Sequence, residues 1–383
     1  MEQINETGRP LRVALLCTGI EDQKGGIETF FYECSRGLQG AEGIELMLCK
    51  GPGDAQKGEV SIPCLLRNHQ LAKFLGVLLH RNSYIIEQIS AFPFFALFVR
   101  RWKPDIIFYS DSNHGFLLYR WRKWLGVDYK LLFSNGGPCK PPFSRTDFVH
   151  QVAPLYNDIA LAAGESSAKH ILVPYGINLP EKGPFICEGD KKALRTKLGL
   201  PQNQRVLVSV GWISATHKRM DYVIREIAAL GSNRPHLAMV GRMDETTPPI
   251  LALARELLGE SGFTAVSVPY EQVAEFYQAA DVFVLASLFE GFGRVFLEAL
   301  GYGLPCLIHD HPVMHYVLGE EGCYGDFSQP GVLGRLYRQT EQHPLREEDQ
   351  IRRYKMVQDR FGWASLRSDY VRMFQHVAAT PIQ

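Results

Sequence analysis

The chain has 383 residues, of which 46% are apolar and 21% charged, a composition typical of a globular protein with about two domains. Lys and Arg number 41, as do Asp and Glu, and this balance gives no electrostatic basis for nucleic-acid binding. The eight cysteines contain no Cys-x-x-Cys pair, which predicts buried free thiols in a reducing compartment.

The N-terminus and the apolar stretches predict a protein that does not span a membrane. Residues 1–10 are polar and lack the basic and apolar regions of a signal peptide. The longest apolar stretch, Ile85 to Val99, is interrupted by Glu87, Gln88 and Pro93, and it is shorter than the ~20 residues of a spanning helix. We therefore expect a cytoplasmic protein.

In the first half of the chain, apolar runs of strand length alternate with segments of helix length. A helix is expected from Gly25-Gly26 to Leu38. The expected strands are Leu11–Leu16, Ile44–Cys49, Asp105–Tyr109 and Lys130–Phe133. This alternation is typical of βα units that build a parallel sheet.

The segment Leu65 to Arg81 is both basic and apolar. It is consistent with a helix packed on the sheet, and also with a helix that rests on an anionic membrane carrying a lipid-linked acceptor. Trp102, Trp121 and Trp124 lie near Arg and Lys residues and would extend such a surface or belong to the core. Both interpretations stay open.

The pattern restarts after a predicted hinge at Leu172 to Lys182, which contains two prolines and a glycine. Expected strands are Val206–Val210, His236–Val240, Thr264–Val268, Val282–Leu285 and Pro305–Ile308, and expected helices are Tyr222–Leu230 and Val273–Ala280. We therefore predict an α/β protein with two doubly wound, Rossmann-like domains, residues 1–178 and 179–361, that face a central cleft. Residues 362–383 are expected to pack back on the first domain, and a ligand is expected at the carboxyl ends of the strands.

The most informative motif is Glu-Gly-Phe-Gly-Arg-Val-Phe-Leu-Glu at residues 290–298, which is expected to run from a loop into a helix starting at Glu298. Glycines before a helix expose backbone N–H groups to an anion. The two carboxylates would repel phosphate but accept hydrogen bonds from sugar hydroxyls on either side of a diphosphate. The alternative is an acidic loop with a glutamate favoured by the helix dipole.

This motif, followed by Ala299-Leu300 and Gly303-Leu304-Pro305, resembles the Glu-x7-Glu motif of the retaining glycosyltransferases of family 4, which have the GT-B fold. Five other segments resemble the family's landmarks in the same order: the glycine loop (25–28), the hinge (173–178), a basic loop (218–221), the segment before the donor strand (278–282) and the start of the last helix (361–363).

The resemblance implies a role for each matching residue. Glu290 would hold the donor sugar, Glu298 the ribose, and Lys218 the diphosphate. His114 would touch the donor sugar and, with Glu290 and Lys218, completes the catalytic candidates; a purely structural histidine is the alternative. The other donor-side candidates are Gly26, Arg219, Gly241, Arg242, Phe292, Gly293 and Arg294, and the acceptor-side candidates are Asn135 and Gly136, which otherwise form a tight turn.

One departure affects the diphosphate site. The family usually has an arginine after the glycine that ends the first C-terminal strand, and this chain has Trp212 after Gly211. Either Arg219 or Arg242 is expected to supply the second positive charge. No Asp-x-Asp and no His or Cys metal spacing occurs, so we expect neither a metal nor another cofactor.

The function implied by the resemblance is retaining transfer of a hexose from a nucleoside diphosphate sugar, commonly a UDP-sugar, to a glycan or lipid-linked acceptor in exopolysaccharide or envelope glycan synthesis. A peripheral contact with the inner face of a membrane is a further expectation, and nucleic acid is not expected as a partner. The alternatives are a sugar-nucleotide epimerase or hydrolase on the same fold, and an inactive glycosyltransferase-like binding protein. The first needs a water-activating group that the sequence does not place, and only Trp212 supports the second.

Overall fold

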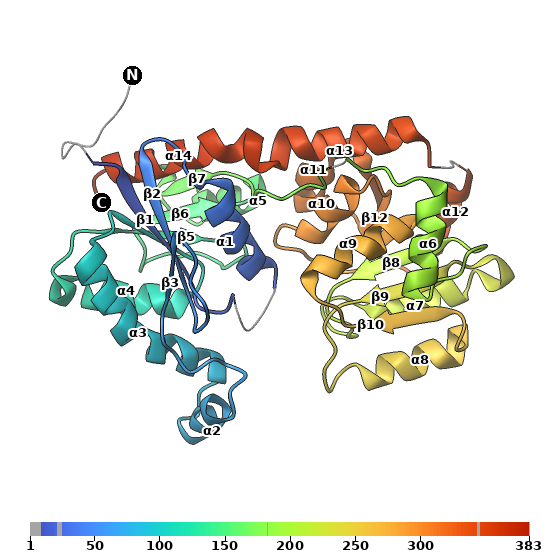
Figure 1. Ribbon diagram of the computed structural model, residues 1–383, viewed down its shortest axis with the longest axis horizontal. Coiled ribbons are helices and arrows are strands. Elements are labelled where there is room, and N and C mark those ends of the chain that lie inside the picture. The colour runs from blue at the N-terminus through green and yellow to red at the C-terminus, as the bar shows by residue number, and fades with distance from the viewer. Residues whose placement is uncertain (1–8, 21–24, 182, 343–344, 383) are drawn as a thin grey trace. The chain divides into compact units, whose positions relative to one another are not determined.

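The computed structural model describes residues 9–20, 25–181, 183–342 and 345–382. Lys182, the end of the predicted hinge, and residues 1–8 of the N-terminal stretch lie outside them. The chain divides into two α/β units, Met1–Asn178 with Phe361–Gln383 (unit 1) and Leu179–Arg360 (unit 2), shown in Figure 1. No helix in the described ranges is long and apolar enough to cross a membrane.

Unit 1 contains a seven-stranded parallel sheet in the order β3-β2-β1-β4-β5-β6-β7. Its strands are β1 (Leu11–Cys17), β2 (Ile44–Lys50), β3 (Glu59–Ser61), β4 (Ile106–Tyr109), β5 (Lys130–Ser134), β6 (Phe148–Gln151) and β7 (His170–Leu172). Its helices are α1 (Gly26–Gly37), α2 (Gln70–Leu78), α3 (Ser83–Trp102), α4 (Ser112–Leu125), α5 (Pro154–Ala162) and α14 (Trp363–Ala379), with the short 3-10 turn η1 (Ser167–Lys169). The strand order reverses between β1 and β4, which is where doubly wound sheets bind ligands.

Both faces of this sheet are covered, which explains why its strands read as continuous apolar runs. Ala14 and Leu16 of β1 belong to one buried cluster with Phe95 of α3. On the other face, the rings of Phe30 (α1) and Phe108 (β4) meet edge to face at 6.2 Å, and Phe108 meets Phe374 of α14 at 5.7 Å. The core of unit 1 therefore has an aromatic layer between the sheet and α1 and α14.

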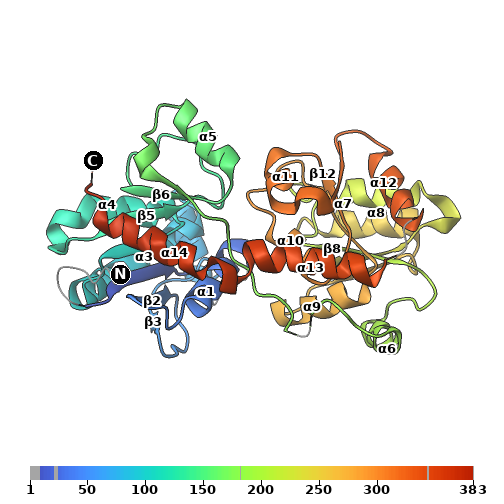
Figure 2. The ribbon, with the colours of Figure 1, turned by 90° about the horizontal axis from the view of Figure 1, so that it is seen from above.

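The last helix, α14, is held on unit 1 by polar contacts as well as by its aromatic side. The ammonium group of Lys130 donates to the carbonyls of Val377, Ala378 and Thr380 at 2.6–2.8 Å. These carbonyls end the helix and have no partner within it, so a cation there stabilises the helix end. Figures 1 and 2 both show α14 running over the strands of unit 1.

Unit 2 contains a six-stranded parallel sheet in the order β10-β9-β8-β11-β12-β13. Its strands are β8 (Val206–Val210), β9 (His236–Val240), β10 (Phe263–Val266), β11 (Val282–Leu285), β12 (Cys306–His309) and β13 (Gly322–Gly325). Its helices are α6 (Glu188–Leu198), α7 (Met220–Ala228), α8 (Pro248–Leu258), α9 (Tyr270–Ala279), α10 (Arg294–Gly301), α11 (Pro312–Leu318), α12 (Val332–Gln342) and α13 (Glu347–Phe361), with the 3-10 turns η2 (Gly231–Asn233) and η3 (Gly319–Glu321).

The predicted fold, two parallel doubly wound sheets, is confirmed, and β8, β9 and β11 have the predicted bounds. The expected helix start at Glu298 is wrong, because α10 begins at Arg294. Gly293 precedes it with φ +78°, a left-handed conformation that glycine adopts without strain and that ends the loop early. Glu298 therefore lies inside the helix. All eight cysteines are free, as expected, but only four are buried: Cys64 and Cys323 are half-buried, and Cys139 and Cys187 are exposed.

Candidate functional site

The strands β8 and β9 are each followed by a glycine, Gly211 and Gly241, and the backbones of these two glycines lie close together. Gly211 and Gly241 have φ near +150°, and a Cβ on Gly241 would lie 2.0 Å from the Gly211 carbonyl oxygen. The aliphatic stem of Lys218 covers Gly211, with its Cε 3.4 Å from the position of a Cβ there. The two glycines thus leave room for the loop before α7 to fold over the ends of the strands.

The loop before α7 brings two basic side chains to Glu290. Lys218 Nζ lies 2.6 Å from Glu290 Oε1, and His217 Nε2 lies 3.4 Å from the same oxygen. Glu290 follows β11, and β11 pairs with β8, so the ion pair lies at the carboxyl ends of two neighbouring central strands. His217 was not predicted from the sequence, although its position directly before Lys218 was the available signal.

The ionisation of Glu290 follows from these contacts. Burial alone would raise its pKa, but hydrogen bonds from His217, Lys218 and Ser287, together with the Lys218 charge, outweigh burial and lower the pKa to about 2. Glu290 is therefore ionised at neutral pH. It can accept hydrogen bonds from hydroxyls but has no proton to donate.

The loop between Glu290 and α10 is packed tightly. Phe292 is buried, and a Cβ on Gly293 would lie 3.0 Å from both Met314 and Phe296. Arg294 is the first residue of α10, so the N–H groups of the first turn of this helix follow the loop directly. Such groups attract anions, which is the role that the sequence predicts for them.

Glu298 is oriented by two tyrosines of the neighbouring helix α9. Tyr270 donates to its Oε1 at 3.2 Å and Tyr277 to its Oε2 at 2.9 Å. Each carboxylate oxygen has more than one acceptor position, so both can accept a further hydroxyl bond. The tyrosines lie 28 and 21 residues before Glu298, and no spacing rule in the sequence pointed to them.

The two arginines proposed for the second positive charge lie in different surroundings. Arg219 donates to the Phe327 carbonyl at 2.8 Å, and its guanidinium lies over the Tyr222 ring at 4.6 Å. Arg242 is exposed, directly follows Gly241, and lies over the Trp212 ring at 5.3 Å. Arg219 therefore ties α7 to the loop at Phe327, whereas Arg242 stands at the end of β9 beside the tryptophan that replaces the expected arginine.

In unit 1, the catalytic candidate His114 lies in the first turn of α4. Its side chain is 2% exposed, and its Nδ1 is 3.6 Å from Asp111 Oδ2. Gly26 is the exposed first residue of α1. The predicted contacts of His114 and Gly26 with a donor sugar stay predictions.

Asn135 and Gly136 have internal contacts that account for them without a ligand. Asn135 accepts a hydrogen bond from Cys139 N at 2.7 Å and donates to Gln151 at 2.9 Å. A Cβ on Gly136 would lie 1.8 Å from the Tyr175 hydroxyl oxygen, so this position has no space for a side chain. Gly136 does not have a positive φ, so it does not form the tight turn of the alternative, and the acceptor-side role of both residues stays a prediction.

A buried charged network near the end of β1 was not predicted. Glu87 accepts hydrogen bonds at 2.8 Å from Thr18 and from the guanidinium of Arg67, which also lies 3.8 Å from Glu28. Burial raises the pKa of Glu87, but the hydrogen bonds and charge of Arg67 outweigh it and lower that pKa below its ordinary value. Thr18 and Glu87 are 69 residues apart, so only the fold brings them together.

A match to a family of known proteins lies within unit 2. Residues 190–335 match the family Glycosyl transferases group 1. This range contains Lys218, Glu290 and Glu298, together with the glycines that end β8 and β9.

Among curated proteins, the chain is 30% identical over 176 residues to mannosylfructose-phosphate synthase of Agrobacterium fabrum, an alignment that covers 43% of this chain and 38% of that protein. It is 29% identical over 170 residues to alpha-monoglucosyldiacylglycerol synthase of Streptococcus pneumoniae, covering 42% and 38%. The alignments span less than two fifths of the length of these relatives.

Solved structures resemble the whole chain. Sucrose-phosphate synthase from Thermosynechococcus elongatus is 17% identical with a TM-score of 0.75, and the likeness covers 96% of this chain and 99% of that one. The Anabaena protein HepE, solved in complex with UDP-glucose, is 13% identical with a TM-score of 0.70, covering 95% and 99%. These likenesses show a GT-B fold, and residues 190–335 are similar to a family of glycosyltransferases.

Proposed function

We propose that this chain is a retaining glycosyltransferase that transfers a hexose from a UDP-sugar to a hydroxyl of a glycan or lipid-linked acceptor, in the synthesis of an exopolysaccharide or envelope glycan. The proposal rests above all on the Lys218–Glu290 pair, 2.6 Å apart at the carboxyl ends of β8 and β11 and directly before the N-terminus of α10. A cation, a helix N-terminus and a fixed carboxylate are the groups that a diphosphate joined to a sugar needs.

Each part of such a donor has a matching group in unit 2. The diphosphate would take Lys218 and the first N–H groups of α10, with Arg242 as the second cation. Once Lys218 turns to phosphate, Glu290 is released to accept hydroxyls of the sugar. Glu298, already oriented by Tyr270 and Tyr277, would accept the ribose hydroxyls. The ion pair seen here is thus the resting arrangement of groups that the donor would separate.

Charge stabilisation is the main catalytic contribution in this proposal. The bond from the anomeric carbon to the diphosphate breaks, and the leaving group gains negative charge beside Lys218. The departing phosphate takes the proton of the acceptor hydroxyl, whose oxygen bonds to the anomeric carbon on the same face, so the configuration is retained. Lys218, Arg242 and the helix N-terminus carry out the neutralisation that a metal performs in other transferases, so we propose that no divalent ion is needed.

The comparisons support this proposal in two ways. A structural neighbour was solved with UDP-glucose, which favours a uridine donor. The name of one relative includes a glycolipid product, which supports a lipid acceptor.

The test is a panel of nucleoside diphosphate sugars assayed for release of the nucleoside diphosphate, with and without candidate acceptors and with a chelator. A transferase releases it only when an acceptor is present, and chelator leaves the rate unchanged. Release that needs no acceptor would indicate a hydrolase or an epimerase that also hydrolyses the donor. Binding without turnover across the panel would indicate an inactive binding protein, and loss of turnover in chelator that manganese restores would contradict the metal-free mechanism.

A further inference from the structure

Helix α2 differs from an ordinary surface helix because its large apolar side chains are exposed rather than buried. Of its nine residues, only the small residues Ala72 and Gly76 are buried. The large apolar side chains face water, with Phe74 64% and Val77 77% exposed. We call the exposed residues Leu71, Phe74, Val77, Leu78 and Leu79 the apolar tip.

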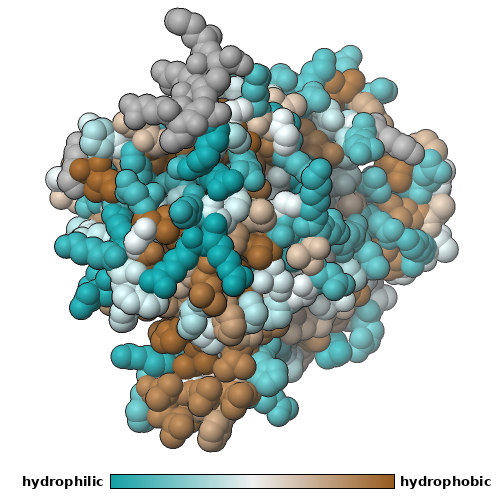
Figure 3. All heavy atoms as spheres, turned by 60° about the vertical axis from the view of Figure 1, so that its left-hand side comes forward, coloured by the Kyte–Doolittle hydropathy of each residue, from teal (hydrophilic) through white to brown (hydrophobic). Residues whose placement is uncertain are grey.

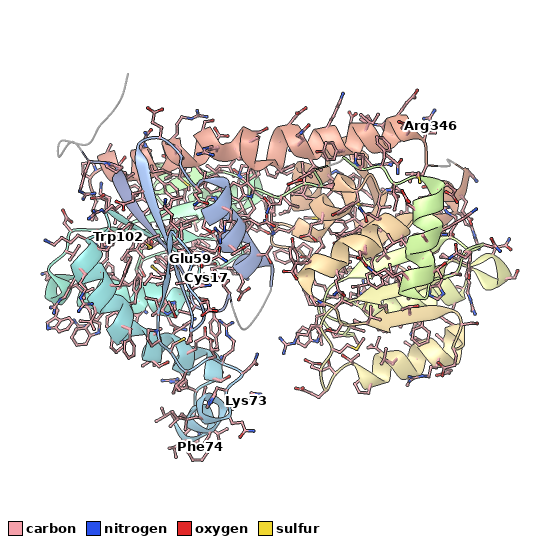
Figure 4. All side chains as sticks on the ribbon, viewed as in Figure 1. Cys17, Glu59, Lys73, Phe74, Trp102 and Arg346 are labelled. Carbon is pink, nitrogen blue, oxygen red and sulfur yellow. The ribbon has the colours of Figure 1, made fainter. Side chains whose placement is uncertain are left out.

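The apolar tip projects from unit 1. Figure 3 shows hydrophobic residues gathered at the bottom of the view, and Figure 4 labels Phe74 and Lys73 on α2, also at the bottom. Because a soluble protein gains stability by burying such side chains, a projecting cluster of them indicates a surface that is covered in use.

The Lys, Arg, Asp and Glu residues near α2 in the sequence all have positive side chains. No acidic residue occurs between Glu59 and Glu87, a stretch that contains three basic residues. Arg67 is taken up by the buried pair with Glu87, while Lys73, between Leu71 and Phe74, and Arg81, two residues after Leu79, are exposed. The chain as a whole has no net charge, so the positive charge is local.

The neighbouring helices continue this character. The helix α2 packs against α3 and α3 against α4. On α4, Trp121 and Trp124 are exposed, and Arg100 of α3 lies 4.1 Å from the centre of the Trp124 ring. Trp102 differs, because it packs against the buried cluster of unit 1. Residues 62–126 contain nine Lys and Arg but three Asp and Glu.

We propose that the apolar tip inserts into the surface of an anionic lipid bilayer, with Lys73 and Arg81 on the lipid headgroups and the exposed tryptophans of α4 at the interface. Apolar side chains on a projecting helix, flanked by basic residues and tryptophan, have the composition of an interfacial membrane helix. A second copy of the chain is the less suitable occupant, because a nine-residue helix offers little area compared with the ~800 Å² per partner of a standard interface.

This inference goes beyond the proposed function and does not depend on it, since the tip lies in unit 1 and the donor residues lie in unit 2. Bilayer binding is expected without donor or acceptor. Vesicle binding without sugar transfer would support the inference and contradict the proposed function. Sugar transfer without vesicle binding would support the proposed function and contradict the inference.

The experiment is flotation of the full chain with phosphatidylcholine vesicles, with and without phosphatidylglycerol, at low and high salt. The variants are Phe74→Glu and Lys73→Ala, and the matched control is Phe185→Glu, since Phe185 is also an exposed phenylalanine but lies in unit 2. All three side chains are exposed, and thermal melting of each variant checks that it is folded.

We expect the wild type to float with anionic vesicles only, and less in high salt. Phe74→Glu should lower vesicle affinity roughly ten- to a hundredfold and Lys73→Ala about fivefold, while Phe185→Glu binds as the wild type does. Failure of the wild type to bind anionic vesicles, or equal binding by a folded Phe74→Glu, would overturn the proposal. A dimer in solution that Phe74→Glu dissociates, without vesicle binding, would assign the tip to a second copy.

Discussion

At the scale of single residues, Lys218 pairs with Glu290 in the absence of ligand and is also proposed to bind the donor diphosphate. Its ion pair with Glu290 holds that carboxylate ionised in the absence of ligand, and its position over Gly211 puts it at the end of the central strand. A donor phosphate and Glu290 would compete for the same ammonium group. Removing either residue should therefore affect binding and turnover differently.

Lys218→Ala should lower kcat more than it raises KM. The leaving diphosphate gains charge as the bond breaks, so the lost cation matters more in the transition state than in the ground state. A lost charge-assisted bond corresponds to about 1.5–3 kcal/mol, or roughly ten- to a hundredfold in kcat. Steady-state kinetics measure this, and a raised KM with an unchanged kcat would mean that Lys218 only binds.

Glu290→Gln and Glu298→Ala should separate sugar recognition from nucleotide recognition. Glu290→Gln removes the competitor for Lys218, so affinity for the bare nucleoside diphosphate should stay equal or rise while transfer is lost. Glu298→Ala removes the ribose acceptor, so that affinity should fall roughly ten- to a hundredfold. Calorimetry on both variants measures this. Equal losses, or a loss in Glu290→Gln alone, would show that the two roles are assigned wrongly.

The pKa of Glu290 makes a prediction about stability. Because its folded pKa is lowered to about 2, its charge contributes stability above the unfolded pKa of ~4.3, and this contribution is lost as pH falls through the folded value. Glu290→Gln should destabilise the protein by about 3 kcal/mol at most at pH 7. In denaturant titrations the difference from the wild type should be constant between pH 7 and about 5 and shrink below about 4. A difference that changes between pH 7 and 5 would indicate another titrating group.

The sequence pointed to Lys218, Glu290 and Glu298 because motif spacing within one loop or one strand–helix connection is local. It did not point to Tyr270 and Tyr277, which orient Glu298 from another helix. The Arg67–Glu87 pair depends in the same way on how α3 packs against the loop before α2, and no local pattern encodes that packing.

At the scale of elements, the approach of β8 to β9 decides the geometry of the site. Gly241 has no space for a methyl group, because the Gly211 carbonyl oxygen would lie 2.0 Å away and belongs to the backbone, which cannot rotate aside. The Lys218 side chain packs over Gly211, so its position depends on this contact. A substitution at Gly241 should therefore disturb the site as well as the sheet.

Gly241→Ala should destabilise the protein by about 3 kcal/mol or more and abolish nucleoside diphosphate binding. Gly231→Ala is the matched control: Gly231 also has a positive φ, of +72°, but nothing lies within 4 Å of a Cβ there, so only backbone strain of ~1–2 kcal/mol is expected. Denaturant titrations and calorimetry compare the two. Equal effects of the two substitutions would mean that the close approach does not shape the site.

The central strands were predictable because a strand buried on both faces is a continuous apolar run, as β8 and β11 are. The strands β3, β6, β7 and β13 were not predicted, because each contains polar residues or glycine and none is a continuous apolar run. The start of α10 was missed because the left-handed Gly293 ends the loop before the acidic residue that was taken as the helix start.

At the scale of the whole molecule, the chain consists of two units that each have their own parallel sheet and core. Lys218, Glu290 and Glu298 all belong to unit 2, as does the range matched by the family. The restart of the strand pattern near residue 206 made this organisation predictable. The C-terminal segment returns to unit 1, and the Lys130 contacts at the end of α14 give a physical reason for it.

We expect the donor to bind to unit 2. Titration calorimetry of UDP into a fragment of residues 179–360 tests it most directly, with the full chain and the Glu298→Ala fragment measured beside it. If unit 2 holds the donor, the folded fragment should bind UDP within about tenfold of the full chain, and Glu298→Ala should weaken this binding roughly ten- to a hundredfold. A folded fragment that does not bind UDP, while the full chain does, would contradict it.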